Sequence, residues 1–191
     1  VVEGSERLDA RAVEVLPELP PNIIAEQLGV RSWFFRDSNW FADFPLSAKQ
    51  TLRAYALEGG MYASDVDLVV GITPTVLERI MAEVGDITLD GVTFSSSNVV
   101  ETLQYDVEYG YEKRDIPFAD RKSVMRPLAH EIVSRIVSGG LFQISSSLEM
   151  LQSLVREKHL FVYAVHKDVA AAVEAFQAEG ALRPSPGDYL L

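Results

Sequence analysis

The sequence predicts an α/β fold in which a mixed β-sheet is flanked by helices, as in an α-β-α sandwich. Short apolar runs alternate along the chain with segments of helical periodicity, and several of these segments begin at a capping residue and end at glycine. The length also bears on the prediction, because 191 residues of which 48% are hydrophobic can bury one sizeable core. We therefore expect residues 1–191 to form a single domain.

The first third of the chain is expected to lead from an extended segment into a strand and a helix. Three prolines within residues 17–21 exclude a continuous helix or a central strand there. Residues 30–35 (VRSWFF) form a short apolar run, which indicates a buried strand. Residues 48–58 are expected to be helical, with Ser47 as the capping residue and Gly59-Gly60 as the end.

The middle of the chain repeats the order of strand and then helix. Residues 65–72 (DVDLVVGI) indicate an apolar strand, and residues 73–85 indicate a helix with a proline in its first turn and a glycine at its end. Asp90-Gly91 lies between two alternating triplets, which predicts a β-hairpin over residues 87–94 at a sheet edge.

Four helices and one strand complete the expected order. They are a helix capped by Ser96 or Ser97 that runs to about Tyr105, a longer helix that begins at Pro117, a helix over 145–158, a strand over 159–165 and a helix over 168–180. Pro127 falls inside the longer helix and is expected to kink or divide it.

Composition and missing motifs exclude several classes of function. A net charge of -11 disfavours general binding of nucleic acid, and the absence of cysteine excludes disulfides and thiol catalysis. No apolar run approaches the roughly 20 residues that a membrane span needs. The chain contains no P-loop, no GxGxxG motif after a strand, no GxSxG elbow and no HExxH motif, so common nucleotide-binding and hydrolase functions are not indicated.

One cluster of polar residues follows the predicted strand at residues 30–35. Arg36, Asp37, Asn39 and Asp43 lie here among aromatic residues, and ligands of α/β proteins often bind at strand ends. A structural role is the alternative, since Asp and Asn side chains also close turns by bonding to their own backbone. The spacing of the two carboxylates does not support a magnesium site.

A second cluster surrounds the start of the predicted long helix. Lys113, Arg114, Arg121, Lys122 and Arg126 gather there. Cationic side chains near a helix N-terminus suit a phosphate or diphosphate, because the orphan N–H groups, the helix dipole and charge-assisted bonds act together. The alternative is a solvated basic face on an acidic protein.

Four segments of the chain resemble a known family in order. They are RDSNWFADFPLSAKQ, DVDLVVGITPTVLERIMAEVGDITLDGVTFSSSNVVETL, DRKSVMRPLAHEI and HLFVYAVHKDVAAAVEAFQAEGAL. This order resembles the bacterial domain-of-unknown-function family four thousand and twelve, from about residue 31 to the end. The resemblance implies a domain outside the cytoplasm in the bacterial cell envelope. With Val1-Val2 at one end and an apolar run at the other, we expect an excised part of a longer protein whose membrane anchor lies in a segment absent from this chain.

The layout is also similar to the LytR-CpsA-Psr family, phosphotransferases that move glycopolymers from a polyprenyl-diphosphate carrier onto the cell wall. The matching positions would be Arg36-Asp37, the stretch from Asp67 to Val92, and Arg114 with Arg121. The family's RxxRQ motif is altered, since Lys122 follows Arg121.

Two functional hypotheses follow. The first is an extracytoplasmic domain that binds a phosphorylated, polyprenyl-diphosphate-linked glycan carrier and could act as a LytR-CpsA-Psr-like phosphotransferase. The second is a noncatalytic interaction or scaffold module that keeps the fold without the chemistry. The first hypothesis assigns catalysis to Arg36 and Asp37 and ligand binding to Arg114, Arg121, Lys122 and Asn39. It leaves the cofactor unassigned, with Mg²⁺ as the candidate, and expects a lipid-linked or diphosphate ligand and no nucleic acid.

Overall fold

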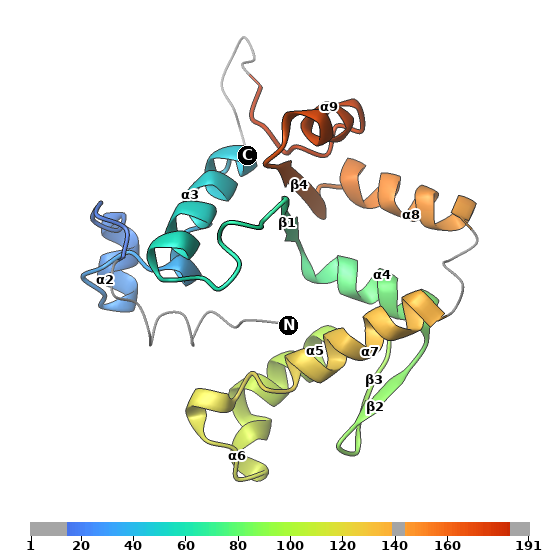
Figure 1. Cartoon of the computed structure of the whole chain (residues 1–191). Coiled ribbons are helices and arrows are strands. Elements are labelled where there is room, and N and C mark those ends of the chain that lie inside the picture. The colour runs from blue at the N-terminus through green and yellow to red at the C-terminus, as the bar shows by residue number, and fades with distance from the viewer. Residues whose placement is uncertain (1–14, 139–143, 184–191) are drawn as a thin grey trace. The chain divides into compact units, whose positions relative to one another are not determined.

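The computed structural model describes residues 15–138 and 144–183 and confirms the predicted α/β class (Figure 1). The chain divides into two compact units. Unit 1 comprises Val1–Gly71 and Phe161–Leu191, and unit 2 comprises Ile72–Leu160. Each unit contains a hydrophobic cluster of its own. The prediction that the chain forms a single domain stays a prediction.

The first described helix of unit 1 was not predicted from the sequence. Helix α2 spans Asn22–Leu28 and ends at Gly29, whose φ of 64° is left-handed. The expectation of an extended segment is therefore wrong for these residues. The reason is that Pro20 and Pro21 both precede the helix, and a proline before the first turn removes no helical hydrogen bond.

The strand expected over residues 30–35 is also not formed. Trp33 makes a single antiparallel bridge with Leu16, and a 3-10 turn over Phe35–Asp37 follows directly. The apolar character of this run reflects burial instead, because Trp33 is 6% exposed and packs with Leu16 and Ala54. A buried aromatic residue produces the same sequence pattern as a short buried strand.

Helix α3 spans Phe44–Leu57, and its cap is Asp43 rather than the predicted Ser47. The Asp43 Oδ1 atom accepts a hydrogen bond from the Leu46 N–H at 3.0 Å. Ser47 lies fully buried in the first turn, where its hydroxyl donates to the Phe41 carbonyl and accepts from the Phe41 N–H, both at 2.8 Å. Because Asp, like Ser, is a favoured capping residue, both satisfied the sequence rule.

Strands β1, Leu68–Ile72, and β4, Leu160–Ala164, pair in one sheet, and all of their residues except Ile72 and Leu160 belong to unit 1. The N–H of Val165 donates to the carbonyl of Asp67 and that of Thr73 to the carbonyl of His159, so the strands run antiparallel. Both strands confirm the prediction. Helix α9, Lys167–Ala175, follows β4 directly.

One face of this sheet packs on helix α3. The rings of Phe44 and Phe161 stack with centroids 5.5 Å apart. A Cβ atom at Gly71 would lie 2.6 Å from the Phe44 ring, so only glycine permits this approach of strand and helix.

Unit 2 holds most of the remaining elements. Their bounds are α4 Pro74–Val84, β2 Ile87–Leu89, β3 Val92–Phe94, α5 Val99–Tyr105, α6 Tyr111–Lys113, α7 Met125–Ser138 and α8 Ile144–Arg156. The predicted hairpin is confirmed, with Asp90 and Gly91 at positive φ between β2 and β3. Figure 1 shows α4, α5 and α7 around this hairpin, and Met81, Phe94 and Leu128 belong to the core that they share.

The long helix of unit 2 begins later than predicted. A 3-10 turn over Phe118–Asp120 follows Pro117, and helix α7 starts at Met125. Pro127 thus falls in the first turn of α7, where the missing N–H costs no helical hydrogen bond, and the predicted kink is not needed. Helix α5 likewise starts at Val99, after the two predicted capping serines.

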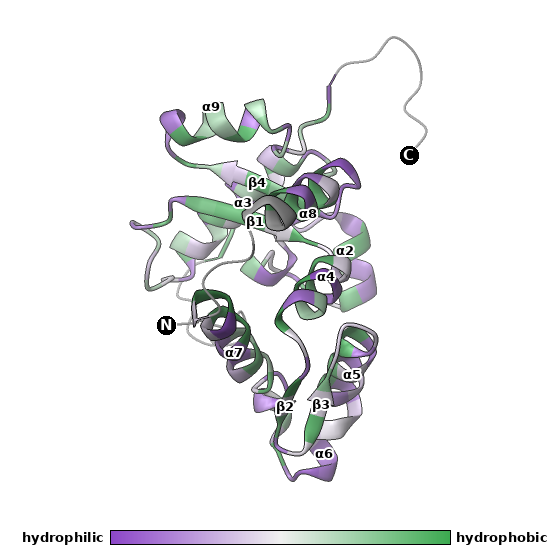
Figure 2. Cartoon of the chain, turned by 90° about the vertical axis from the view of Figure 1, so that its right-hand side faces the viewer, coloured by the Kyte–Doolittle hydropathy of each residue, from purple (hydrophilic) through white to green (hydrophobic). Residues whose placement is uncertain are grey.

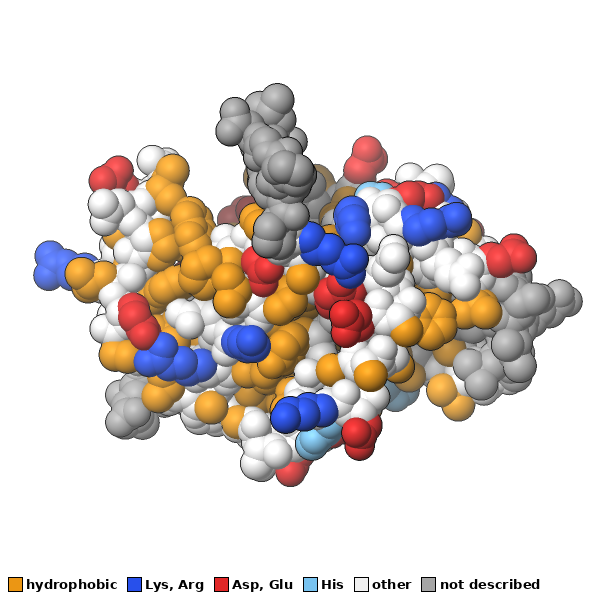
Figure 3. Space-filling model, turned by 90° about the horizontal axis from the view of Figure 1, so that it is seen from above, with side chains coloured by type: hydrophobic (Ala, Val, Ile, Leu, Met, Phe, Trp, Pro, Cys, Tyr) orange, Lys and Arg blue, Asp and Glu red, His pale blue; other side chains and the backbone are white. Residues whose placement is uncertain are grey.

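The described strands form two separate antiparallel pairs instead of one mixed sheet. Strand β1 pairs with β4, and β2 pairs with β3. Residues 30–35, which we expected to form a further strand of the sheet, contribute no strand and make a single bridge, between Trp33 and Leu16. Many large apolar side chains of the described residues are exposed, and Figure 3 shows apolar areas on the face that it draws.

Candidate ligand-binding site

Of the first predicted cluster, Arg36 and Asp37 lie together in the 3-10 turn of unit 1. The Arg36 Nε atom lies 3.4 Å from Asp37 Oδ2, and the guanidinium lies 4.8 Å from the centre of the Phe34 ring. The Asp37 carbonyl accepts a hydrogen bond from the Trp33 indole at 2.9 Å. The turn therefore anchors the buried tryptophan and pairs the two proposed catalytic side chains with each other.

The other two polar residues of this cluster have different surroundings. Asn39 is exposed in the loop before α3. Asp43 uses both carboxylate oxygens within the fold, because Oδ1 caps α3 and Oδ2 accepts from the Leu182 N–H at 2.9 Å. The Asp43 side chain thus ties the start of α3 to the segment that follows α9, which explains its position without a metal ion.

In unit 2, Arg114 is held by a buried carboxylate. Its Nη2 atom lies 2.6 Å from both oxygens of Asp106, which is 4% exposed. Asp106 begins a π-helical turn, Asp106–Gly110, and a Cβ atom at Gly110 would lie 2.7 Å from Asp106 Oδ1. The glycine leaves room for the ion pair, and π-helical turns of this kind occur frequently at functional sites.

Arg121 and Lys122 follow the 3-10 turn of unit 2. The Arg121 guanidinium lies 3.9 Å from the centre of the Phe118 ring, which contacts Tyr111 edge-on. Burial raises the pKa of Tyr111, and the Glu112 carboxylate that bonds to its hydroxyl raises it further. Lys122 is exposed.

The structure thus forms two separate groups of predicted site residues. Arg36, Asp37 and Asn39 belong to unit 1, whereas Arg114, Arg121 and Lys122 belong to unit 2. The prediction that Arg36 shares one cavity with Arg114 or Arg121 stays a prediction.

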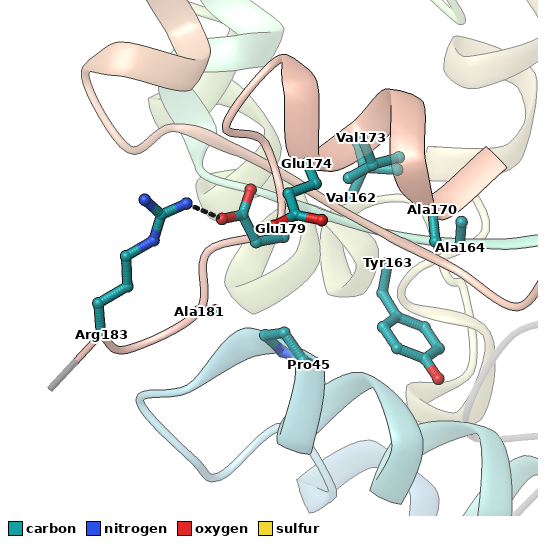
Figure 4. A pocket seen from close by; sticks show the side chains of 10 residues that line it. All are labelled: Pro45, Val162, Tyr163, Ala164, Ala170, Val173, Glu174, Glu179, Ala181 and Arg183. Carbon is teal, nitrogen blue, oxygen red and sulfur yellow. Dashed lines mark hydrogen bonds and ion pairs between the residues drawn. The ribbon is translucent and has the colours of Figure 1, made fainter. Parts of the chain in front are cut away.

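A pocket of about 370 Å³ lies within unit 1, and sequence reasoning missed it (Figure 4). Its lining comes from the start of α3, strand β4, helix α9 and the segment after α9. These residues are Pro45, Val162, Tyr163, Ala164, Ala170, Val173, Glu174, Glu179, Ala181 and Arg183. The volume falls in the range of small-molecule sites. The sequence feature that could have indicated this pocket is the pair of small side chains, Ala164 and Ala170, which leave space beside β4 and α9. Alanine alone does not indicate a pocket, however, because it also occurs where two elements pack closely.

The charged residues of the pocket are two carboxylates and one guanidinium. Arg183 donates to Glu179 Oε1 at 2.7 Å, and this bond, with the charges of Glu179 and Glu174, raises the pKa of Arg183. The Lys49 ammonium lies 5.9 Å from the centre of the Tyr163 ring, which belongs to the lining. Among the residues that line the pocket, Glu179 and Arg183 compensate each other, so Glu174 leaves one negative charge in the lining itself, and the Lys49 ammonium lies outside the lining on the Tyr163 ring.

Other kinds of site find no support in the described part of the chain. No group of three or more His, Asp or Glu residues within residues 15–138 and 144–183 is placed to hold a metal ion. In the same ranges, no helix has the length and apolar character required to cross a bilayer.

The fold and the pocket define an α/β protein whose unit 1 holds a ligand-sized concavity. The chain belongs to the family described as "Protein of unknown function (DUF4012)", which matches residues 4–108. The match includes Arg36, Asp37 and the hairpin but ends before Arg114 and Arg121. No curated protein and no solved structure matches the chain.

Proposed function

We propose that this chain is a noncatalytic binding module of the bacterial cell envelope, exposed outside the cytoplasm, with the pocket of unit 1 as its site. The observation that carries the proposal is the pocket itself, which combines an apolar surface with charged residues. The contacts of the predicted catalytic and ligand-binding residues also favour it. Arg36 and Asp37 pair with each other, and Arg114 is bound to a buried carboxylate. The envelope location rests on the family resemblance.

The ligand favoured by this pocket is an apolar group that carries a positive charge, such as a lysine side chain of a peptide. Its apolar part would contact Val162, Ala170 and Val173, which β4 and α9 supply. Its charge would be attracted by Glu174, because Arg183 is already paired with Glu179. An anionic ligand of the same size would meet the same excess carboxylate and bind more weakly.

Titration calorimetry with octylamine and octanoate tests this function. We expect octylamine to bind better than octanoate, and Ala170→Phe to abolish the binding by filling the pocket. Ala171→Phe is the matched control, because Ala171 is exposed on the same helix and does not line the pocket. Equal binding by both variants, or no binding of octylamine to the wild type, would contradict the proposal.

The second candidate is the polyprenyl-diphosphate carrier, with or without phosphotransfer. It is favoured by Arg36 and Arg121, whose guanidinium groups each lie over a phenylalanine ring. Arginine suits such a ligand because its planar head can stack on an aromatic face and bond to phosphate along its edge.

Farnesyl diphosphate is the probe for this second candidate. A hydrogen bond between charged groups contributes about 1.5 to 3 kcal/mol, so Arg36→Ala should weaken binding roughly tenfold to a hundredfold. Arg31→Ala is the control, because Arg31 is an exposed arginine five residues away. Equal effects of the two substitutions would reduce the result to general charge attraction and count against a carrier site at Arg36.

A further inference from the structure

Strand β1 carries exposed apolar side chains on one of its two faces. The side chains of Leu68, Val70 and Ile72 have exposed fractions of 44%, 52% and 60%. Val69 and Gly71, on the opposite face, are half-buried, and Gly71 contacts Phe44 of α3. The hydropathy colours of Figure 2 show β1 as an apolar strand. This pattern is the reverse of the usual one, in which the face away from the helix carries polar residues.

The same three residues direct their backbone groups to the open edge of β1. The bonds at Asp67 and Thr73 place the odd-numbered residues of β1 in hydrogen-bonded pairs with β4. The N–H and C=O groups of Leu68, Val70 and Ile72 therefore point away from β4. In the described sheet β1 has β4 as its one neighbour, whereas the outer edge of β4 is engaged where the Val162 N–H donates to the Ala178 carbonyl.

We propose that β1 is a self-association edge, which pairs antiparallel with β1 of a second copy of this chain about a twofold axis at Val70. In this register Val70 lies opposite Val70 of the second copy, and Leu68 lies opposite Ile72. Each of these pairs is of the hydrogen-bonded type, so the six backbone groups of one edge meet the six of the other. The product is a four-stranded antiparallel sheet in the order β4, β1, β1, β4.

The sequence of β1 favours a second copy over an unrelated strand, because its pattern is complementary to itself. Reversal about Val70 places a large apolar residue opposite a large apolar residue at each edge-facing position. It also places Asp67 opposite Thr73, so the carboxylates of the two copies lie at opposite ends of the ribbon. A closed twofold contact of this kind uses the same surface patch on both copies.

The overall charge opposes association, which yields a distinctive salt dependence. Each copy carries a net charge of -11, and salt screens the repulsion between the copies. We therefore expect sedimentation equilibrium to show a monomer–dimer equilibrium that shifts towards dimer as the salt concentration rises. Val70→Lys should weaken the dimer about tenfold or more, because it places two like charges directly opposite each other. Val169→Lys, on an exposed position of α9, is the matched control and should leave the dimer intact.

The absence of cysteine makes disulfide trapping a clean test of the register. Residues opposite each other in a hydrogen-bonded pair have Cα atoms about 5.5 Å apart, within the range that a disulfide spans. We expect Val70→Cys to form a covalent dimer under mild oxidation much faster than Val169→Cys. Leu68→Cys and Ile72→Cys should each crosslink slowly alone and quickly when mixed.

Each result of these experiments bears on the proposal. A wild-type chain that stays monomeric at high concentration and high salt, with no preferential crosslinking of Val70→Cys, would overturn it. Fast crosslinking of Leu68→Cys with itself would overturn the register, since it requires a different pairing. A dimer that Val70→Lys leaves unchanged would assign the association to another surface.

Discussion

The two Arg–Asp pairs of this chain share the same chemistry but lie in different environments. Arg36 and Asp37 are adjacent in a surface turn, where the arginine side chain is 40% exposed. Arg114 and Asp106 are eight residues apart, and the carboxylate is buried within a π-helical turn. Water screens the first pair and is largely excluded from the carboxylate of the second. We therefore expect the second pair to matter for folding and the first to be available for binding without a large effect on stability.

The largest effect should come from removing the buried carboxylate. Asp106→Ala leaves the Arg114 guanidinium half-buried without its partner, which should cost about 3 kcal/mol of unfolding free energy. Nε of Arg114 is already buried without a hydrogen-bond partner in the described structure, so the group has little alternative compensation. Urea denaturation measures the loss. A change below about 1 kcal/mol would place this pair in the same class as a surface pair.

The next effect should come from the glycine that makes room for this pair. Gly110→Ala puts a Cβ atom 2.7 Å from Asp106 Oδ1, so the carboxylate must move away from Arg114. We expect a loss of about 1 to 2 kcal/mol. In the Asp106→Ala background the same substitution should be neutral or stabilising, because alanine has the higher helix propensity. Losses that simply add in the double variant would contradict a coupling between the two residues.

The exposed pair should respond much less. Arg36→Ala removes its contacts with Asp37 and the Phe34 ring, and a surface pair of this kind contributes about 0 to 1 kcal/mol. Denaturation under the same conditions as for Asp106→Ala provides the direct comparison. If Arg36→Ala lowers the free energy of unfolding as much as Asp106→Ala does, the 3-10 turn over Phe35–Asp37 has a structural role. That result would weaken the proposal that Arg36 binds a polyprenyl-diphosphate carrier.

The smallest effect should be a dependence of stability on pH from Glu157. The Ser153 hydroxyl donates to this carboxylate at 2.5 Å and lowers its pKa from the usual 4.5, with further help from the Arg79 charge. A lowered folded-state pKa contributes stability that is present above pH 4.5 and is lost as the pH falls through the folded-state value. Ser153→Ala should therefore flatten the stability profile on the acid side, as followed by thermal unfolding at several pH values. An unchanged profile would mean that the hydrogen bond does not persist in solution.

Much of the fold could be predicted from local patterns. The hairpin at Asp90-Gly91, helix α4 with Pro74 in its first turn, and strands β1 and β4 were all predicted from turn residues and periodicity. Helix α2 was not predicted, because prolines exclude a helix only where they lie inside it, and Pro20 and Pro21 lie before this one. The prediction of a strand over residues 30–35 was wrong, because a buried tryptophan gives the same apolar sequence pattern as a strand paired in a sheet.

The candidate site was less predictable than the fold. Pro45 of α3 and Arg183 after α9 line one pocket although 138 residues separate them in sequence. Arg114 matched a phosphate-binding pattern, but its partner Asp106 lies eight residues before it, on a π-helical turn that no sequence rule indicated.

The sequence by itself determined the α/β class, the hairpin and most helix positions, because capping, turn geometry and periodicity act between residues that are close along the chain. Only the tertiary structure decided which strands pair, which charges are already neutralised and where a pocket forms. Those properties depend on contacts between distant segments, such as the Asp43 carboxylate with the Leu182 backbone. Their energies depend on burial, which changes the value of an ion pair without any change in the residues that form it.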